Sequence, residues 1–190
     1  MQKLTQAFVV LAAAVVIPPV FNATVASRPA LADEAELPGA DTQFLAKAIV
    51  SGRNEVELSQ LAAQKAAQPD VKHFAEHMVK EHTAVNEKLM NEAQRHKINT
   101  KGTYGTPPLE PSPEAQATKN QLSGLSGDKL DKAYMQKMID DHVQAIAMFK
   151  DEAKDGKDSA LRTLADTVLP NLEQHLKEAR AIGSKIGTES

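Results

Sequence analysis

The chain has 190 residues, enough for one domain with a sizeable hydrophobic core. Its 22 basic and 25 acidic residues give a net charge of −3, which offers no electrostatic basis for binding nucleic acid or anionic lipid. It contains no cysteine and no tryptophan, so disulfides, a lipid-modified amino-terminal cysteine and a cysteine nucleophile are all excluded.

Residues 1–32 have the pattern of a signal peptide. Lys3 supplies a positive charge, residues 7–17 form an uncharged apolar segment, and residues 30–32 (Ala-Leu-Ala) form a small-x-small cleavage site. Cleavage after Ala26 is the alternative position. The alternative is an uncleaved membrane anchor, but the apolar segment is shorter than the roughly 20 residues that a membrane-spanning helix needs.

Cleavage after residue 32 defines the mature chain. It removes Lys3, Arg28 and no acidic residue, so the net charge falls from −3 to −5. We expect the mature protein to lie in the periplasm or the extracellular space, soluble, without an integral membrane segment and without affinity for nucleic acid. We expect residues 33–40 to be disordered.

Four segments with an apolar period of 3.6 residues follow, and each predicts an amphipathic helix. They cover residues 41–67, 70–96, 128–155 and 158–182. Asp41, Asp70 and Asp158 stand where helix N-caps are expected, and Gly183 is a typical helix stop. Pro170 falls inside the last segment and should bend it, because proline removes one helical hydrogen bond.

The connections between these segments predict the topology. Short joints after the first and third segments favour two antiparallel hairpins. Residues 97–127 form a longer connection, rich in proline and glycine, with a helix-start signal at residues 112–114 (Ser-Pro-Glu). Such a length favours a crossover along a bundle, and the alternative is a loose linker between independent hairpins. We therefore predict an all-α fold over residues 41–182, a ferritin-like four-helix bundle of two antiparallel hairpins joined by a long crossover, with a tail at 183–190.

Each helix carries one polar residue inside its apolar stripe. These residues are Glu55 in the first helix and His82, His142 and His175 in the other three. Glu55 and His82 are equally distant from the first turn, so they should face each other. His142 and His175 differ in height by about one helical turn, roughly 5 Å. Whether the two hairpins bring these residues to one level depends on the crossover, and the sequence leaves this open.

Imidazoles and a carboxylate that converge inside a bundle are typical of a metal site. We interpret Glu55, His82, His142 and His175 as ligands of one transition-metal ion, which could be copper, zinc or iron. The alternative is a polar network in which each group is satisfied by a neighbour and holds the bundle in register.

Two further sets of residues are weaker candidates. Met78 and Met138 each precede a core histidine by one helical turn. A thioether beside an imidazole suits copper, but methionines also fill gaps in hydrophobic cores. His73 and His77 are one turn apart and could bind a surface metal ion, but an exposed helix flank is the preferred interpretation, and we assign no function to them.

Four motifs of the chain together resemble DUF4142, a bacterial family of exported ferritin-like proteins whose activity is not established. They are SGxxEVxL at 51–58, VKxFAxxMVxEH at 71–82, YMxxMIxDH at 134–142 and LPxLxxHL at 169–176. The resemblance covers about residues 40–182. It implies a ferritin-like four-helix fold and points to the same Glu55, His82, His142 and His175.

The chain departs from di-iron ferritin-like proteins, which carry Glu-x-x-His motifs on two helices. Val79, Ile139 and Leu172 stand three residues before the core histidines, so a carboxylate-bridged di-iron centre is not expected. The leading hypothesis is a periplasmic bundle that binds a single metal ion. The alternatives are a structural or stress-protective bundle without metal, and a metal-dependent oxidoreductase, which would need an open coordination position and a pocket.

Overall fold

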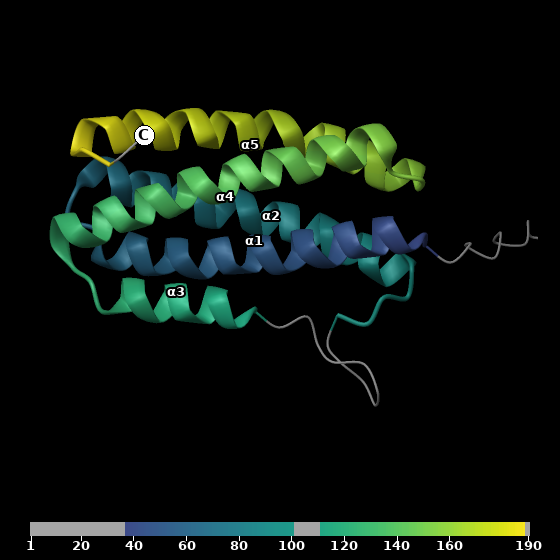
Figure 1. Ribbon diagram of the computed structural model, residues 1–190, viewed down its shortest axis with the longest axis horizontal. Coiled ribbons are helices and arrows are strands. Elements are labelled where there is room, and N and C mark those ends of the chain that lie inside the picture. Colours follow the sequence, from purple (N-terminus) through teal and green to yellow (C-terminus); the bar gives the residue numbers. More distant parts are fainter. Residues whose placement is uncertain (1–36, 101–110, 189–190) are drawn as a thin grey trace, which may run out of the picture. The chain divides into compact units, whose positions relative to one another are not determined.

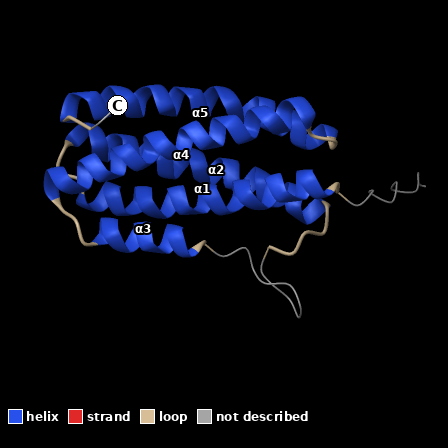
Figure 2. Ribbon diagram, viewed as in Figure 1, coloured by secondary structure: helices blue, strands red, loops and turns tan. Residues whose placement is uncertain are grey.

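The computed structural model describes residues 37–100 and 111–188, which fold into five helices (Figure 1). The helices are α1 (Gly39–Lys65), α2 (Pro69–Arg95), α3 (Pro113–Ser123), α4 (Gly127–Asp155) and α5 (Ser159–Ile186). All regular structure within the described residues is helical (Figure 2). The predicted all-α class is therefore confirmed.

The four long helices form two antiparallel hairpins, α1 with α2 and α4 with α5, as the short joints predicted. The chain leaves α2 at one end of the bundle and begins α4 at the other, so the connection crosses the length of the bundle (Figure 1). Helix α3 lies within this crossover, beside α1. Lys119 of α3 pairs with Glu57 at 2.6 Å, and Lys65 donates to the carbonyl of Ser123 at 2.7 Å.

The predicted signal peptide lies outside the described residues and stays a prediction. Residues 37–40, expected to belong to a disordered segment, are instead ordered. Leu37 is buried in the core, and Thr42 donates its backbone N–H to Pro38 at the start of α1. Within the part of the chain that the structure describes, no helix is both long and apolar enough to cross a membrane.

Two of the three predicted N-caps are wrong. Helix α1 begins after Pro38 and α2 after Gln68, so Asp41 and Asp70 lie in the first turns of their helices rather than ahead of them. Asp158 does cap α5, because its side chain accepts the N–H groups of Ala160 at 2.8 Å and Leu161 at 2.9 Å.

The last helix is longer than predicted. Helix α5 continues through Pro170 and past the expected stop at Gly183, ending at Ile186. Gly187 takes the left-handed conformation with φ 75°, which glycine adopts without strain, and Thr188 donates to the carbonyl of Gly183 at 2.9 Å. Gly183 itself is buried under Thr188, so it permits close packing and does not end the helix.

A buried aspartate near the start of α1 closes the turn of the opposite hairpin. Asp41 accepts the backbone N–H of Lys157 at 2.9 Å and that of Asp158 at 2.6 Å, both between α4 and α5. Asp131, near the start of α4, does the same for the turn between α1 and α2. It accepts the N–H of Ala67 at 3.1 Å and that of Gln68 at 2.7 Å. Each hairpin therefore supplies the acceptor for the other hairpin's turn, one at each end of the bundle.

The hydrophobic core consists of two separate clusters. One contains Phe44, Leu89, Phe149 and Leu172, and the other contains Leu58, Phe74, Tyr134 and Ile182, among further residues. Each of the four long helices contributes to both clusters. Each helix therefore crosses from one apolar cluster to the other near the middle of its length.

Candidate metal centre

The four polar residues singled out from the sequence lie where the long helices pass between the two hydrophobic clusters. Glu55 on α1, His82 on α2, His142 on α4 and His175 on α5 are all buried. On every helix, the neighbours on one side belong to one cluster and those on the other side to the second. The structure thus places all four in a single polar layer across the bundle, which the sequence had left open.

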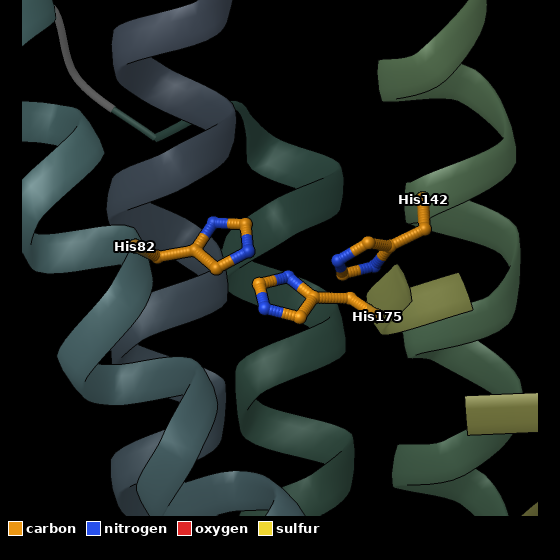
Figure 3. Close-up of side chains that lie close together, drawn as sticks. All are labelled: His82, His142 and His175. Atoms are coloured by element: carbon orange, nitrogen blue, oxygen red, sulfur yellow. The ribbon is translucent and has the colours of Figure 1, made fainter. Parts of the chain in front are cut away.

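The three imidazole rings form a triangle. The ring centroids of His82, His142 and His175 are 5.4 Å apart in each of the three pairs. The rings point toward one another from three helices (Figure 3). One nitrogen of each ring lies within 4.8 Å of the corresponding nitrogens of the other two.

Glu55 lies against His82, as their equal distance from the turn predicted. The Nδ1 atom of His82 is 2.8 Å from Oε2 of Glu55. The other ring nitrogen, Nε2, is buried and contacts no hydrogen-bonding group of the described protein. The carboxylate therefore engages one side of the ring and leaves the other side free.

His142 is fixed in a comparable way by its own helix. Its Nδ1 lies 2.8 Å from the carbonyl oxygen of Met138, one turn earlier, and donates its proton there in the neutral ring. In that tautomer Nε2 carries a lone pair, and this buried atom has no hydrogen-bond partner among the described residues. Nδ1 of His175 is likewise buried and has no hydrogen-bond partner among the described residues.

The protonation of the pair of Glu55 and His82 differs from that of the other two histidines. Burial disfavours the charged form of each group, but the attraction between the Glu55 carboxylate and the His82 imidazolium outweighs this effect. The pKa of Glu55 is consequently lowered and that of His82 raised from their ordinary values. The contact therefore favours the charged form of both groups, a carboxylate beside an imidazolium.

His142 and His175 are held neutral. Burial lowers the pKa of His142 and outweighs the opposing attraction of the Glu55 carboxylate, while the nearby charge of His82 adds to the lowering. Burial likewise lowers the pKa of His175, with further lowering by His82, His142 and His77, to about 3. Neutral imidazole is the form that coordinates a metal ion, so these two rings are prepared to bind at neutral pH.

The two methionines lie in the hydrophobic core. Met78 and Met138 are fully buried in the cluster that also contains Phe74 and Tyr134. Met138 additionally contributes its carbonyl oxygen, which orients His142. These positions favour a packing role for both side chains.

A second group of residues, which the sequence did not single out, lies on the outer side of His175. His77 and Glu81 on α2 join His175 in a set of three whose ligand atoms all lie within 4.8 Å of one another. The sequence had paired His77 with His73, its neighbour one turn earlier on the same helix. The useful signal was the spacing of four residues between His77 and Glu81, which puts both on one helix face.

Comparisons with known proteins agree with the fold. The model of a domain of unknown function, DUF4142, matches residues 26–182. No curated protein resembles the sequence closely enough to count as a match.

Solved structures of low sequence identity share the architecture. A DUF305 fragment from Deinococcus radiodurans aligns with a TM-score of 0.66 at 18% identity, over 78% of this chain and 98% of its own. A DUF305 protein from Streptomyces coelicolor, provisionally described as secreted, aligns with a TM-score of 0.64 at 15% identity, over 80% and 96%. CopM in its Cu(I)-bound form aligns with a TM-score of 0.62 at 16% identity, over 76% and 96%.

Proposed function

This chain belongs to the DUF4142 family, and on that premise we propose that it is an exported bundle whose core binds one transition-metal ion. The ligands in this proposal are Nε2 of His82, Nε2 of His142 and Nδ1 of His175. One observation carries it: three buried ring nitrogens from three helices converge, and no described protein group satisfies them.

A buried polar atom without a partner costs about 1–3 kcal/mol. A structural polar network would be expected to pair these nitrogens with one another or with the backbone. Instead, Glu55 and the Met138 carbonyl engage the far sides of two rings and leave the facing nitrogens free. A single cation between the rings would satisfy all three nitrogens at once.

The spacing of the rings fits one ion after a small adjustment. Three nitrogens bound at about 2.0–2.1 Å from a common ion lie about 3.4 Å from one another. The three nitrogens here are within 4.8 Å of one another, so binding of one ion requires each pair to close by at most about 1.4 Å.

Copper is the best-supported ion among copper, zinc and iron. Imidazole ligands suit all three, but for a given nitrogen site the divalent copper ion binds most tightly. CopM, which has the same overall fold, has been solved with Cu(I) and with Cu(II). The absence of a Glu-x-x-His motif, noted above, disfavours a carboxylate-bridged di-iron centre.

We assign Glu55 a supporting role rather than that of a ligand. Its carboxylate touches Nδ1 of His82, the nitrogen opposite the free Nε2. A carboxylate in this position fixes the orientation of a ligating ring and increases its basicity. Its negative charge would also offset part of the charge of the bound ion.

The space beside this pair is small. A cavity of about 20 Å³ is lined by Glu55, His82 and apolar side chains such as Leu89 and Phe149. This volume has room for about one water molecule and for no organic substrate. The geometry therefore supports metal binding better than oxidation of an organic substrate at this centre.

Metal analysis of the mature protein, purified without chelator and then titrated with Cu(II), tests the proposal. We expect one copper ion per chain at saturation and a higher melting temperature in the loaded protein, because a ligand that binds only the folded state stabilises it. A protein that takes up no copper, zinc or iron, with an unchanged melting temperature, would contradict the proposal and favour a polar network without metal.

Substituting Glu55 by glutamine should weaken binding without changing its stoichiometry. The amide keeps the shape of the side chain but loses the charge that supports His82, so affinity should fall about 10–100-fold. Chelator competition measures this change. Glu57→Gln is the matched control, since Glu57 is on the same helix but pairs with Lys119 on the surface. Equal affinities for both variants would argue against the supporting role.

The metal-free protein should lose stability in mild acid through His175. Above its ordinary pKa of 6.5, neither the folded nor the unfolded chain binds a proton there. Between pH 6.5 and the folded value of about 3, only the unfolded chain does. Stability should therefore fall by about 1.4 kcal/mol per pH unit for this one proton, and His142 acts in the same direction.

Urea unfolding of the metal-free wild type and of His175→Leu between about pH 5 and 7 isolates this contribution as the difference between their slopes, because groups of opposite effect such as Glu152, whose pKa is raised to about 7, are common to both. His175→Leu removes the group, so the variant should show a shallower decline than the wild type over the same range. Parallel curves for the two proteins would show that His175 is not held neutral.

A further inference from the structure

The outer group of His77, Glu81 and His175 differs from the buried centre in its exposure. The side chains of His77 and Glu81 are 44% and 29% exposed, whereas His175 is only 3% exposed. His175 is also the residue that this group shares with the triangle of His82 and His142. One ring therefore belongs both to a solvent-facing set of ligands and to a buried one.

The outer group is held together by contacts of its own. Nε2 of His77 lies 3.6 Å from Oε1 of Glu81, one helical turn further along α2. The other carboxylate oxygen, Oε2, accepts a hydrogen bond of 3.1 Å from the side chain of Asn171. Asn171 is one turn before His175 on α5, so it holds Glu81 across the gap between the two helices.

The rings of His77 and His175 are also close. Their centroids are 5.5 Å apart, and the rings stand nearly perpendicular to each other, at 82°. That separation nearly equals the 5.4 Å between the rings of the buried triangle. Two imidazoles and a carboxylate are ligands that Cu(II) and Zn(II) both accept.

Among the residues that the structure describes, these are the two groups of at least three histidine or carboxylate side chains close enough to hold a metal ion. The buried one lies between two hydrophobic clusters, where an ion cannot arrive with its hydration shell intact. The outer group of His77, Glu81 and His175 faces solvent and shares the ring of His175 with the buried group. A stepwise route follows, in which protein ligands replace water before the ion reaches the core.

We propose that His77, Glu81 and His175 form a loading position, through which the metal ion passes between solvent and the buried centre. This inference rests on the proposed function. The ion is first bound by His77, Glu81 and one nitrogen of His175, and these ligands are then exchanged for Nε2 of His82, Nε2 of His142 and Nδ1 of His175. Only ligand exchange takes place, with no change in the charge of the ion. At equilibrium the ion occupies the buried centre, and the chain holds one ion.

The rates of loading and release test this route. Cu(II) is mixed rapidly with the metal-free protein and loading is followed by the absorbance of the copper–imidazole centre. Release is followed by transfer of the copper to a chelator. In His77→Ala the rates of loading and release should both fall by about tenfold or more, because the variant lacks a surface ligand that guides the ion into the protein. Their ratio, and therefore the equilibrium affinity, should stay within about twofold. Glu81→Gln should slow both rates in the same way.

His73→Ala is the matched control, since His73 is an exposed histidine one turn before His77 on the same helix and belongs to neither group. Its rates should equal those of the wild type. Wild-type rates in His77→Ala and Glu81→Gln, with the buried centre still binding copper, would overturn the loading position and leave the proposed function intact. A wild type that holds two copper ions would also overturn it, because the outer group would then be a permanent site. A wild type that binds no copper would refute the proposed function itself.

Discussion

Replacing His142 by leucine is expected to abolish stoichiometric copper binding while the bundle stays folded. The substitution removes one of three proposed ligands, so affinity should fall by more than the roughly 100-fold that a lost supporting contact can cost. Leucine has a similar volume, and position 142 lies between Met138 and Ala145, where both hydrophobic clusters offer apolar neighbours. The change loses one hydrogen bond, from Nδ1 to the Met138 carbonyl, which costs about 1 kcal/mol, and it also removes a buried nitrogen that has no partner among the described residues.

Competition with a chelator of known affinity gives the change in binding, and urea unfolding of the metal-free protein gives the change in stability. His96→Leu is the control for removing a buried histidine, because the His96 side chain is 4% exposed and lies beside Asp158, away from the centre. That variant should bind copper like the wild type. Wild-type affinity in His142→Leu would exclude the three-histidine centre.

Replacing Asp131 by alanine is expected to lower the free energy of unfolding by about 2–4 kcal/mol. The fully buried carboxylate accepts the N–H groups of Ala67 and Gln68 in the turn between α1 and α2. These are hydrogen bonds to a charged acceptor, which contribute more than neutral ones. Without the carboxylate, two backbone donors lose their partner and a small void remains.

Asp128→Ala controls for the loss of a negative charge in the first turn of α4. Asp128 is exposed and makes only a long contact of 3.4 Å with the side chain of Gln68. Its substitution should change the unfolding free energy by less than about 0.5 kcal/mol. If urea unfolding gave the two variants equal stability, the turn-closing role of Asp131 would be wrong.

The sequence was sufficient for features that depend on short-range spacing. The contact of Glu55 with His82 followed from their equal distance to one turn, and the start of α3 from the Ser112 cap. The class of fold followed from periodicity and loop length. These inferences succeed because helix geometry relates residue number to position along one helix or one hairpin.

The sequence did not predict contacts between residues that are far apart in the chain. Asp41 looked like an N-cap, because its spacing to its own helix is visible and its partners at residues 157 and 158 are not. The common level of His82 and His142 depends on how the crossover sets one hairpin against the other. The group of His77, Glu81 and His175 was missed for the same reason, since it joins α2 to α5.

The reciprocal aspartates have a consequence for how the protein folds and opens. Because the acceptors for these turn N–H groups lie 63 to 117 residues away in sequence, neither hairpin has them paired as in the native structure before the other has docked. Hairpin formation and hairpin association thus become one cooperative event, and a stable half-folded chain with one intact hairpin is disfavoured. The proposed metal centre lies between these two ends of the bundle. Fraying at either end of the bundle must therefore break the hydrogen bonds of one of these aspartates before it can expose the histidines to solvent.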